Sequence, residues 1–563
     1  MKLARNLLLA GCSAAVLSAC NGAQEIASPG TGSVNVNITN PAPTPTPSPT
    51  PTSTLVTPAA GCPTIADPQG LRDGGTISGP TGTYRICVLP ARIVRSSTLT
   101  RIPGLLYQLA GRTDVGYDNG PTPLSSTNTR TVVDPSGATI TLTADSNVEL
   151  TIQPGVIIYA NTGVAWLNVN RGNRINAVGT ATQPIIFTSR DNINGLNTDT
   201  SSGQWGGVVL SGRAPITDCA NTGATPGTIA CERQTEGAVD PALYGGATPA
   251  DNSGTMRYVQ IRYSGYVLSG NSELQSLTTQ GVGSATQLSH IQTFNSSDDG
   301  AEFFGGRVNM KYFISVGAED DNLDTDTGLK GNFQYVIVAQ RLNATPAVAD
   351  SIIEADSDNP VDGDQPRQNV RLSNFTFISR VTGNANNASM LLRGGTDYTM
   401  VNGVLINTAT GGNTCLRVSR AQTASTTQNA AIDEYGAPQF RSVVFNGCGA
   451  TPFLGANGVT NDQVSALFGS GSNNNNVNYT PTLTSLFING TNETAVPAFN
   501  ASTFNGEVFN GITLTPAGFF DATSYIGAVR DASDTWYQGW TCNSSHASLG
   551  TGNTGLCTSI PAI

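Results

Sequence analysis

Histidine and charged residues are both scarce in this chain of 563 residues. It contains two histidines, His290 and His546, and charged residues make up 12% of it. A Ser-His-Asp triad needs an oriented histidine beside a nucleophile, and a zinc site needs clustered histidines or cysteines, so the sequence favours neither. It also lacks a basic, aromatic-rich face, and runs such as Gly305-Gly306 lack the flanking pattern of a phosphate loop. We therefore expect no nucleic acid partner.

A long apolar run is also missing. No stretch reaches the roughly 20 uninterrupted apolar residues of a spanning helix. The chain begins instead with the basic residues Lys2 and Arg5, an apolar segment from Leu7 to Leu17, and then Ser18-Ala19-Cys20. This layout predicts a secretory signal over residues 1–19.

The end of that signal resembles a bacterial lipobox. The resemblance implies that Cys20 is lipidated and becomes the mature N-terminus, whereas an ordinary cleaved signal is the alternative. Asn21 follows the cysteine, which by resemblance to known sorting favours the outer membrane, with the periplasmic or the cell-surface face left open. The predicted membrane contact is thus through the lipid anchor only.

Residues 20–60 read as a disordered linker. Prolines alternate with Ala, Thr or Ser from Pro41 to Pro51, and such a run stays extended as polyproline II. It would hold the folded part away from the lipid.

Eight of the ten cysteines remain once Cys12 and Cys20 are set aside. An even count in an exported chain predicts disulfides. Pairing in sequence order would close short local loops, but the sequence leaves the connectivity open. The eight are Cys62, Cys87, Cys219, Cys231, Cys415, Cys448, Cys542 and Cys557.

The most informative segment for the fold runs from Glu149 to Arg190. Short alternating apolar strands, such as Leu150 to Ile152 and Ile185 to Thr188, are separated by turns containing Gly and Pro. A strand this short cannot bury its inward side chains alone, so stacked coils are the economical solution. The segment resembles right-handed parallel β-helix proteins, and an irregular β-sandwich is the alternative.

Further strand cores can be placed at intervals of 22 to 40 residues, which suit single coils with and without inserted loops. They centre on Val259, Ile291, Phe313, Val336, Phe375, Val404 and Val444. The prediction is an all-β, right-handed, single-stranded parallel β-helix (a solenoid). Its N-terminal cap and first coils span 61–148, its main body 149–530 and its C-terminal cap 531–563.

Several short motifs point to a family. They include Gln204-Trp205-Gly206-Gly207, Asp298-Asp299-Gly300, Phe304-Gly305-Gly306, Leu391-Leu392-Arg393-Gly394-Gly395 and Trp536-Tyr537-Gln538-Gly539-Trp540. Over residues 80 to 545 the chain resembles a family of exported bacterial β-helix proteins. The resemblance implies export and the fold, but no chemistry.

Negative charge is concentrated in one segment. Fourteen acidic and four basic residues lie between Asp298 and Asp364, a net charge of -10, while the whole chain has -11. Asp298, Asp299 and Glu302 recur 22 residues later as Asp320, Asp321 and Asp324. Because equivalent residues of adjacent coils lie about 4.8 Å apart, this spacing predicts stacked carboxylate pairs.

Stacked carboxylates either raise one another's pKa or bind a cation. Oxygen ligands without histidine or cysteine favour Ca²⁺ over Zn²⁺. We predict that calcium is bound by Asp298, Asp299, Asp320, Asp321 and Asp324, with Asp326 as a further ligand. A solvated acidic turn that binds no ion tightly is the competing interpretation.

A catalytic interpretation is weaker. Asp298-Asp299-Gly300 resembles part of the pattern of galacturonan hydrolases of this fold, but their Gly-His-Gly is missing here. A calcium-dependent lyase would need a Lys or Arg base, and Arg307, Lys311 and Lys330 are the nearest in sequence. No catalytic residue is predicted.

The predicted function is a non-catalytic envelope lipoprotein for binding or adhesion. Its partner would be a polysaccharide, an envelope protein or a transporter. A calcium-dependent polysaccharide lyase or glycoside hydrolase is the alternative, and a basic residue poised over the acidic turns would distinguish the two.

Overall fold

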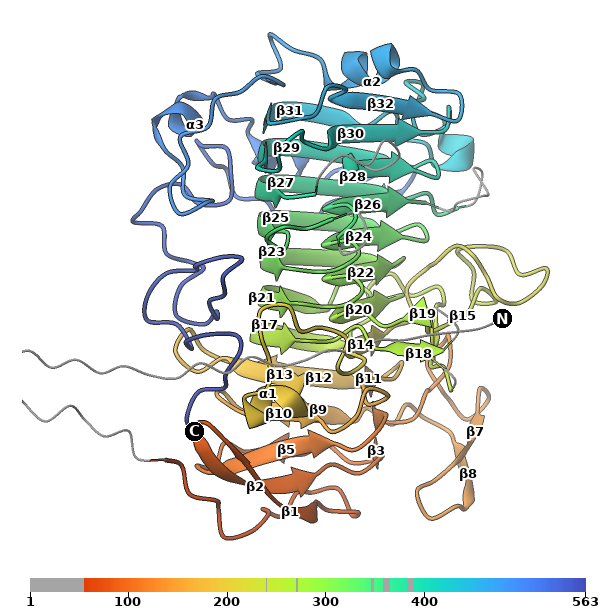
Figure 1. Ribbon diagram of the computed structural model, residues 1–563. Helices are drawn as coiled ribbons and strands as arrows, with labels where there is room; N and C mark the ends of the chain where they lie inside the picture. The colour runs from red at the N-terminus through yellow and green to blue at the C-terminus, as the bar shows by residue number, and fades with distance from the viewer. Residues whose placement is uncertain (1–54, 239, 270–271, 346–348, 358–364, 382–387) are drawn as a thin grey trace, which may run out of the picture. The chain divides into compact units, whose positions relative to one another are not determined.

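A computed structural model describes residues 55–238, 240–269, 272–345, 349–357, 365–381 and 388–563 (Figure 1). The predicted signal, Cys20 and most of the predicted linker lie outside these residues. Within the described part of the chain, no helix has both the length and the apolar character needed to cross a membrane.

Residues 55–563 form a stack of coils with strands on two main sheets. Sheet A has 15 strands, and apart from the antiparallel β1–β2 pair its ladder is parallel. Its strands are β1 (Arg72–Gly79), β2 (Gly82–Val88), β4 (Ser97–Leu99), β5 (Leu105–Leu109), β9 (Glu149–Ile152), β10 (Ile157–Ala160), β12 (Arg174–Val178), β13 (Ile185–Ser189), β17 (Gly254–Arg262), β21 (Gln287–Phe294), β23 (Arg307–Val316), β25 (Lys330–Ala339), β27 (Asn369–Ser379), β29 (Asp397–Asn407) and β31 (Gln439–Asn446).

Sheet B has 11 shorter parallel strands, and each coil contributes one of them. They are β3 (Arg92–Ile93), β6 (Thr113–Val115), β11 (Leu167–Val169), β14 (Val208–Ser211), β20 (Leu277–Gln280), β22 (Ala301–Phe304), β24 (Leu323–Asp326), β26 (Ile353–Asp356), β28 (Ala388–Arg393), β30 (Thr414–Ser419) and β32 (Phe453–Ala456). The alternation of sheet A and sheet B strands along the chain confirms the predicted parallel β-helix.

The helices and hairpins are short additions to this stack. The helices are α1 (Arg190–Asn194), α2 (Asn461–Phe468) and α3 (Thr491–Ala495), with 3₁₀ turns at Ala430–Ile432 and Ala501–Phe504. The hairpins are β7 (Arg130–Val133) with β8 (Thr139–Leu142), β15 (Arg233–Gln234) with β16 (Leu243–Tyr244), β18 (Val267–Ser269) with β19 (Ser272–Glu273), and β33 (Val508–Phe509) with β34 (Ile512–Thr513).

The predicted strand cores all lie on strands of sheet A, but the last two are one residue away from the positions equivalent to the first five. Val259, Ile291, Phe313, Val336 and Phe375 align across five coils. In the next coil Phe375 pairs with Gly403, so Val404 and Val444 are paired with each other one position further along. Only glycine fits at position 403, because a Cβ there would lie 1.9 Å from Cζ of Phe375. The Phe375 ring fills the space of a side chain there.

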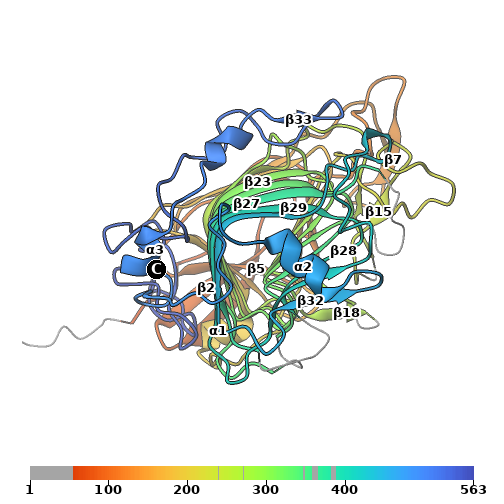
Figure 2. The same ribbon diagram turned by 90° about the horizontal axis from the view of Figure 1, so that it is seen from above.

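The long strands of sheet A curve around the core at one repeated position (Figure 2). Seven residues at equivalent places have a positive φ between 53° and 64°: Tyr258, His290, Tyr312, Tyr335, Asn374, Asn402 and Ser442. This backbone conformation is uncommon outside glycine. Contacts between the rings support this conformation in the first four coils, with centroid separations of 4.4, 4.3 and 4.9 Å along the column.

One apolar core extends through the coils and is closed by α2. Val464 and Phe468 of this helix are buried, and the Phe468 ring lies 4.4 Å from Phe445 and 5.3 Å from Phe453 between centroids. Thr460 and Gln463 form a capping box at its start. Figure 2 shows α2 lying across this end of the stack.

The segment after α2 returns along the outside of sheet A to the first coils (Figure 1). Amide side chains of sheet A hold this segment. Each amide donates one hydrogen bond to the backbone of a single residue and accepts one from it, over distances of 2.7 to 3.1 Å. The pairs are Asn402 with Phe499, Gln334 with Asp521 and Gln292 with Cys542. The amide of Gly104 donates to the carbonyl of Ile563 at 2.9 Å. Residues 531–563 were predicted as a C-terminal cap. They lie beside coils whose residues come much earlier in the sequence, such as Gly104 and Gln292.

Four disulfides join the eight cysteines in sequence order. The pairs are Cys62–Cys87, Cys219–Cys231, Cys415–Cys448 and Cys542–Cys557. The two cysteines of each pair are 12 to 33 residues apart in the sequence, so each disulfide closes a short local loop. Four such bonds indicate an extracytoplasmic protein.

Candidate metal centre

Three successive coils place acidic residues at equivalent positions of sheet B. Glu302 of β22 pairs with Asp324 of β24, which pairs with Glu354 of β26. In these strands the alternate residues, such as Phe303 and Thr325, are buried in the core. The carboxylates therefore line the opposite, outer face of the sheet.

Seven carboxylates come close enough together to share cations. They form three overlapping groups, and within each group one ligand oxygen per residue lies within 4.8 Å of the others. The groups are Asp298, Asp299 and Asp320; Asp299, Glu302 and Asp324; and Asp321, Asp324 and Glu354. We call these seven residues the acidic cluster.

Backbone hydrogen bonds fix two members of the acidic cluster. Oδ1 of Asp299 accepts from the backbone N–H of Asp321 at 2.9 Å, and Oδ1 of Asp321 accepts from that of Ser351 at 2.7 Å. Each bond ties a carboxylate to the next coil. Because each bond uses one oxygen, the second oxygen of each carboxylate stays available to an ion.

Positive charge near the acidic cluster is limited. Arg393 of β28 pairs with Glu354 and, at 2.9 Å, with Asp356. Across the described residues, Glu354 is the one member of the acidic cluster that has an ion pair with a basic side chain. The other six carboxylates thus have no ion pair among the described residues, although the charge of Arg393 also acts on Asp320 and Asp324.

Burial raises the pKa of all seven carboxyl groups. Burial is the largest cause, followed for most of them by repulsion from neighbouring carboxylates; for Asp298 the first of these is Asp320. The pKa of Asp298 rises to about 8, and that of Glu354 to about 7, because Arg393 opposes part of the effect of burial. A bound cation would reverse these shifts.

This electrostatic arrangement predicts an unusual dependence of stability on pH. A carboxyl whose pKa is raised by folding holds a proton that the unfolded chain releases, so the free energy of unfolding falls as pH rises towards the folded pKa. We expect the calcium-free protein to lose roughly 3 kcal/mol of its free energy of unfolding between pH 6.5 and pH 8.5 as Asp298 and Glu354 ionise. Thermal unfolding in a chelator measures this.

The control for that experiment is the same scan with calcium. Saturating calcium should remove the loss, because the ion binds the ionised carboxylates. The scan stays above pH 6.5 because burial lowers the pKa of both His290 and His546, whose protonation in the unfolded chain would destabilise the fold at lower pH. A chelated protein that gains stability from pH 6.5 to pH 8.5 would contradict the prediction.

The donor set fits calcium. Two oxygens bound to one Ca²⁺ at 2.3–2.6 Å lie at most about 5 Å apart, which matches the spacing within each group. All seven ligands are hard oxygens, and overlapping groups allow more than one ion. With six to eight ligands per ion, backbone carbonyls and water would complete each shell.

Five of the six predicted calcium ligands belong to the acidic cluster. The sixth, Asp326, lies outside the three groups; burial and then the neighbouring Asp356 raise its pKa. Glu302 and Glu354 belong to the cluster but were not among the predicted ligands. Ile353-Glu354-Ala355-Asp356 repeats the pattern of Leu323-Asp324-Thr325-Asp326 after 30 residues, a signal that could have identified Glu354.

The basic residues considered for a lyase lie elsewhere. Arg307 and Lys311 are on β23 and Lys330 is on β25, all in sheet A rather than sheet B. Lys311 pairs with Asp521 at 2.8 Å and Lys330 with Asp433 at 2.7 Å. None of the three contacts the acidic cluster.

Comparison with known proteins gives one family match. Residues 132–494, more than half of the chain, match the family described as "Pectate-lyase like beta helix domain". The matched region includes the whole acidic cluster. No curated protein and no solved structure gave a significant match.

Proposed function

Since the chain belongs to the family of pectate-lyase-like β-helix domains, we propose that it is a calcium-binding β-helix of the bacterial cell envelope that binds a partner without cleaving it. The observation that carries this proposal is the acidic cluster, in which three overlapping carboxylate groups on consecutive coils have almost no protein counter-charge. Calcium bound there would have coordination sites left for an anionic partner.

The envelope location rests on the sequence and the disulfides. The lipobox-like end of the signal supports a lipid anchor at Cys20, and four disulfides support an oxidising compartment. A linker rich in proline would then hold the β-helix away from the membrane. A polysaccharide or an envelope protein is the proposed partner.

Cleavage of the partner is less well supported than binding. Arg393, which borders the acidic cluster, is engaged by Glu354 and Asp356, so it is a poor base. The carboxylate oxygens of Asp298 and Asp299 lie within 4.8 Å, less than the roughly 6.5–9.5 Å that admits an attacking water in inverting hydrolases. These features argue against a lyase that uses Arg393 as its base and against an inverting hydrolase that uses this pair of carboxylates.

Calorimetry on the full chain tests the proposal. Calcium is titrated into chelator-treated wild type and into an Asp298→Asn, Asp320→Asn double variant. Both residues belong to the first carboxylate group, so we expect heat of binding from the wild type and a large loss of affinity in the variant.

An Asp73→Asn, Asp531→Asn variant is the matched control. It removes the same charge from two half-exposed residues outside the acidic cluster, and should bind calcium like the wild type. Absence of binding to the wild type would refute a calcium site. Equal binding by all three proteins would place the ion elsewhere.

A further inference from the structure

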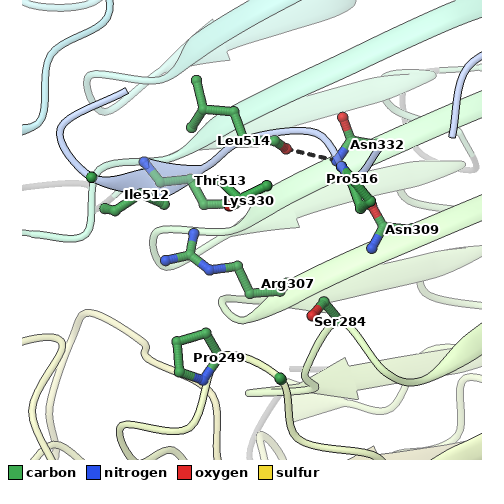
Figure 3. Close-up of a pocket in the computed structure, with 12 residues that line it drawn as sticks. Pro249, Ser284, Arg307, Asn309, Lys330, Asn332, Ile512, Thr513, Leu514 and Pro516 are labelled. Atoms are coloured by element: carbon green, nitrogen blue, oxygen red, sulfur yellow. Dashed lines mark hydrogen bonds between the residues drawn. The ribbon is translucent and has the colours of Figure 1, made fainter. Parts of the chain in front are cut away.

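A second site lies on sheet A, where the strands β23 and β25 begin. A hollow of about 420 Å³ opens there (Figure 3). Its floor is formed by outward side chains of the two strands, and its walls by Pro249 and Ala250 on one side and by residues 511–516 of the returning segment on the other. None of its twelve lining residues is acidic, in a chain of net charge -11.

Arg307 is a cation without a counter-ion in this hollow. Within the described residues it forms no ion pair, and its buried Nη1 has no hydrogen-bond partner. Burial lowers its pKa to about 10, which Asp433 offsets only in part. Figure 3 shows the guanidinium directed into the space between Ile512 and Pro249.

The neighbouring lysine does not supply the missing charge. Lys330 pairs with Arg307 across the two strands, so two cations lie side by side. Asp433 lies 2.7 Å from Nζ of Lys330, with both side chains 1% exposed. Asp433, the carboxylate whose charge acts on Arg307 within the described part of the chain, is therefore already bound to the lysine, and the charge of Arg307 is left without an ion pair there.

Neutral donors surround the same space. Oδ1 of Asn309 accepts from Nδ2 of Asn332 at 2.9 Å, which leaves the amide nitrogen of Asn309 free to face the hollow. The hydroxyl of Ser284 lies on the same side (Figure 3). The guanidinium can thus bind an oxyanion at one side of the hollow, and the amide nitrogen and the hydroxyl can donate to polar groups of the same ligand at the other side.

A second hollow of about 470 Å³ adjoins the first and shares Ser284, Asn309 and Pro516 with it. It too has no acidic lining residue, and it adds Arg257 and the ring of Phe519. The Arg257 guanidinium lies over the ring of Tyr258, 4.9 Å from its centroid. The hollow is also lined by Lys311, which pairs with Asp521 at 2.8 Å and lies over the Phe519 ring, 5.4 Å from its centroid. It therefore offers aromatic surface and two more cations beside the first hollow.

We propose that these two hollows bind an organic anion, whose oxyanion group contacts Arg307 in the first hollow while its body passes Asn309 and Ser284 and lies against Phe519 in the second. The oxyanion can be a carboxylate, a sulfate or a phosphate, since all three present paired oxygens to a guanidinium. The site is on a different sheet from the acidic cluster and needs no metal ion.

Calorimetry on the full chain in a chelator tests this proposal separately from the calcium site. The probes are inorganic sulfate, inorganic phosphate, acetate and glucuronate, which distinguish the sources of the oxyanion. We expect at least one to bind the wild type, and Arg307→Gln to weaken that binding roughly tenfold to hundredfold through loss of charge-assisted hydrogen bonds. Tighter binding of glucuronate than of acetate would support a role for the second hollow.

Arg174→Gln is the matched control, because Arg174 is an exposed arginine of β12 on the same sheet. It should bind the probes like the wild type, and both variants should keep the wild-type melting temperature within a few degrees. If no probe binds the wild type, or if Arg307→Gln binds as tightly as Arg174→Gln, the proposal is wrong. Failure here would leave the calcium site untouched.

Discussion

Replacing Asp324 with asparagine is expected to remove calcium binding and, at the same time, to stabilise the calcium-free protein. Asp324 belongs to two of the three carboxylate groups, so its loss affects both. Replacing a residue that only hydrogen-bonds to a metal ligand typically lowers metal affinity by about 10- to 100-fold. For a direct ligand such as Asp324 we expect calcium affinity to fall by at least roughly 100-fold.

The stabilisation follows from the electrostatics of the folded state. Burial, and then repulsion from Glu354 and Asp356, raise the pKa of Asp324 well above its ordinary value. A neutral amide of the same shape avoids that penalty, and raising a pKa by one pH unit corresponds to about 1.4 kcal/mol. At pH 8 the variant should therefore unfold at a higher temperature than the wild type in a chelator, and at a lower one in calcium.

Asp326→Asn is the control on the same strand. Its pKa is raised in the same way, mainly by burial, but it lies outside the three carboxylate groups. It should stabilise the calcium-free protein and keep most of the calcium affinity. Equal effects of both variants on calcium binding would show that the metal centre is not built as described.

Trp540→Ala is expected to cost about 3–5 kcal/mol of the free energy of unfolding, the range for large aromatic residues in a core. Trp540 belongs to the returning segment, and its side chain is fully buried where that segment packs on sheet A. Its indole N–H donates to the carbonyl of Trp536 at 2.8 Å, and its ring meets Tyr258 and His290 edge-on. Denaturant unfolding monitored by circular dichroism measures the loss.

Leu556→Ala provides the comparison within the same segment. Leu556 is 57% exposed, so its truncation should change stability by less than about 0.5 kcal/mol. If Trp540→Ala were as mild as Leu556→Ala, the returning segment would contribute little to the stability of sheet A. Hydrogen exchange at β17 and β21 would then be unchanged as well.

The coil repeat was the part of this molecule that the sequence revealed best. Three carboxylate positions recurring after 22 residues matched one coil, and the structure pairs Glu302 with Asp324 at that spacing. The strands between residues 149 and 190 were also recognisable, because each is short, alternating and bounded by turns. Local periodicity was sufficient for both.

Other features depend on contacts that no local pattern encodes. Glu354 is displaced from Asp324 by 30 residues instead of 22, because a loop is inserted between the coils. Val404 is buried in β29 as expected, but it packs in the cluster on the outer face of sheet A, and the residue equivalent to Phe375 is Gly403, whose missing side chain leaves room for the Phe375 ring. The position of residues 531–563 depends on amides such as Gln292, which lie some 250 residues earlier in the chain.

The returning segment also sets an order for the assembly of the molecule. Solenoids can fold coil by coil as their repeats emerge, since each repeat contacts its neighbours. Here the outer apolar face of sheet A, from Tyr263 to Val444, is covered by residues 479–557, all of which are synthesised after the coils they cover. The early coils must therefore persist with that face open to water until synthesis is well past α2, an interval in which exposed apolar strands aggregate readily. A cell that makes this protein has to keep it protected during that interval, before the last segment closes over the sheet.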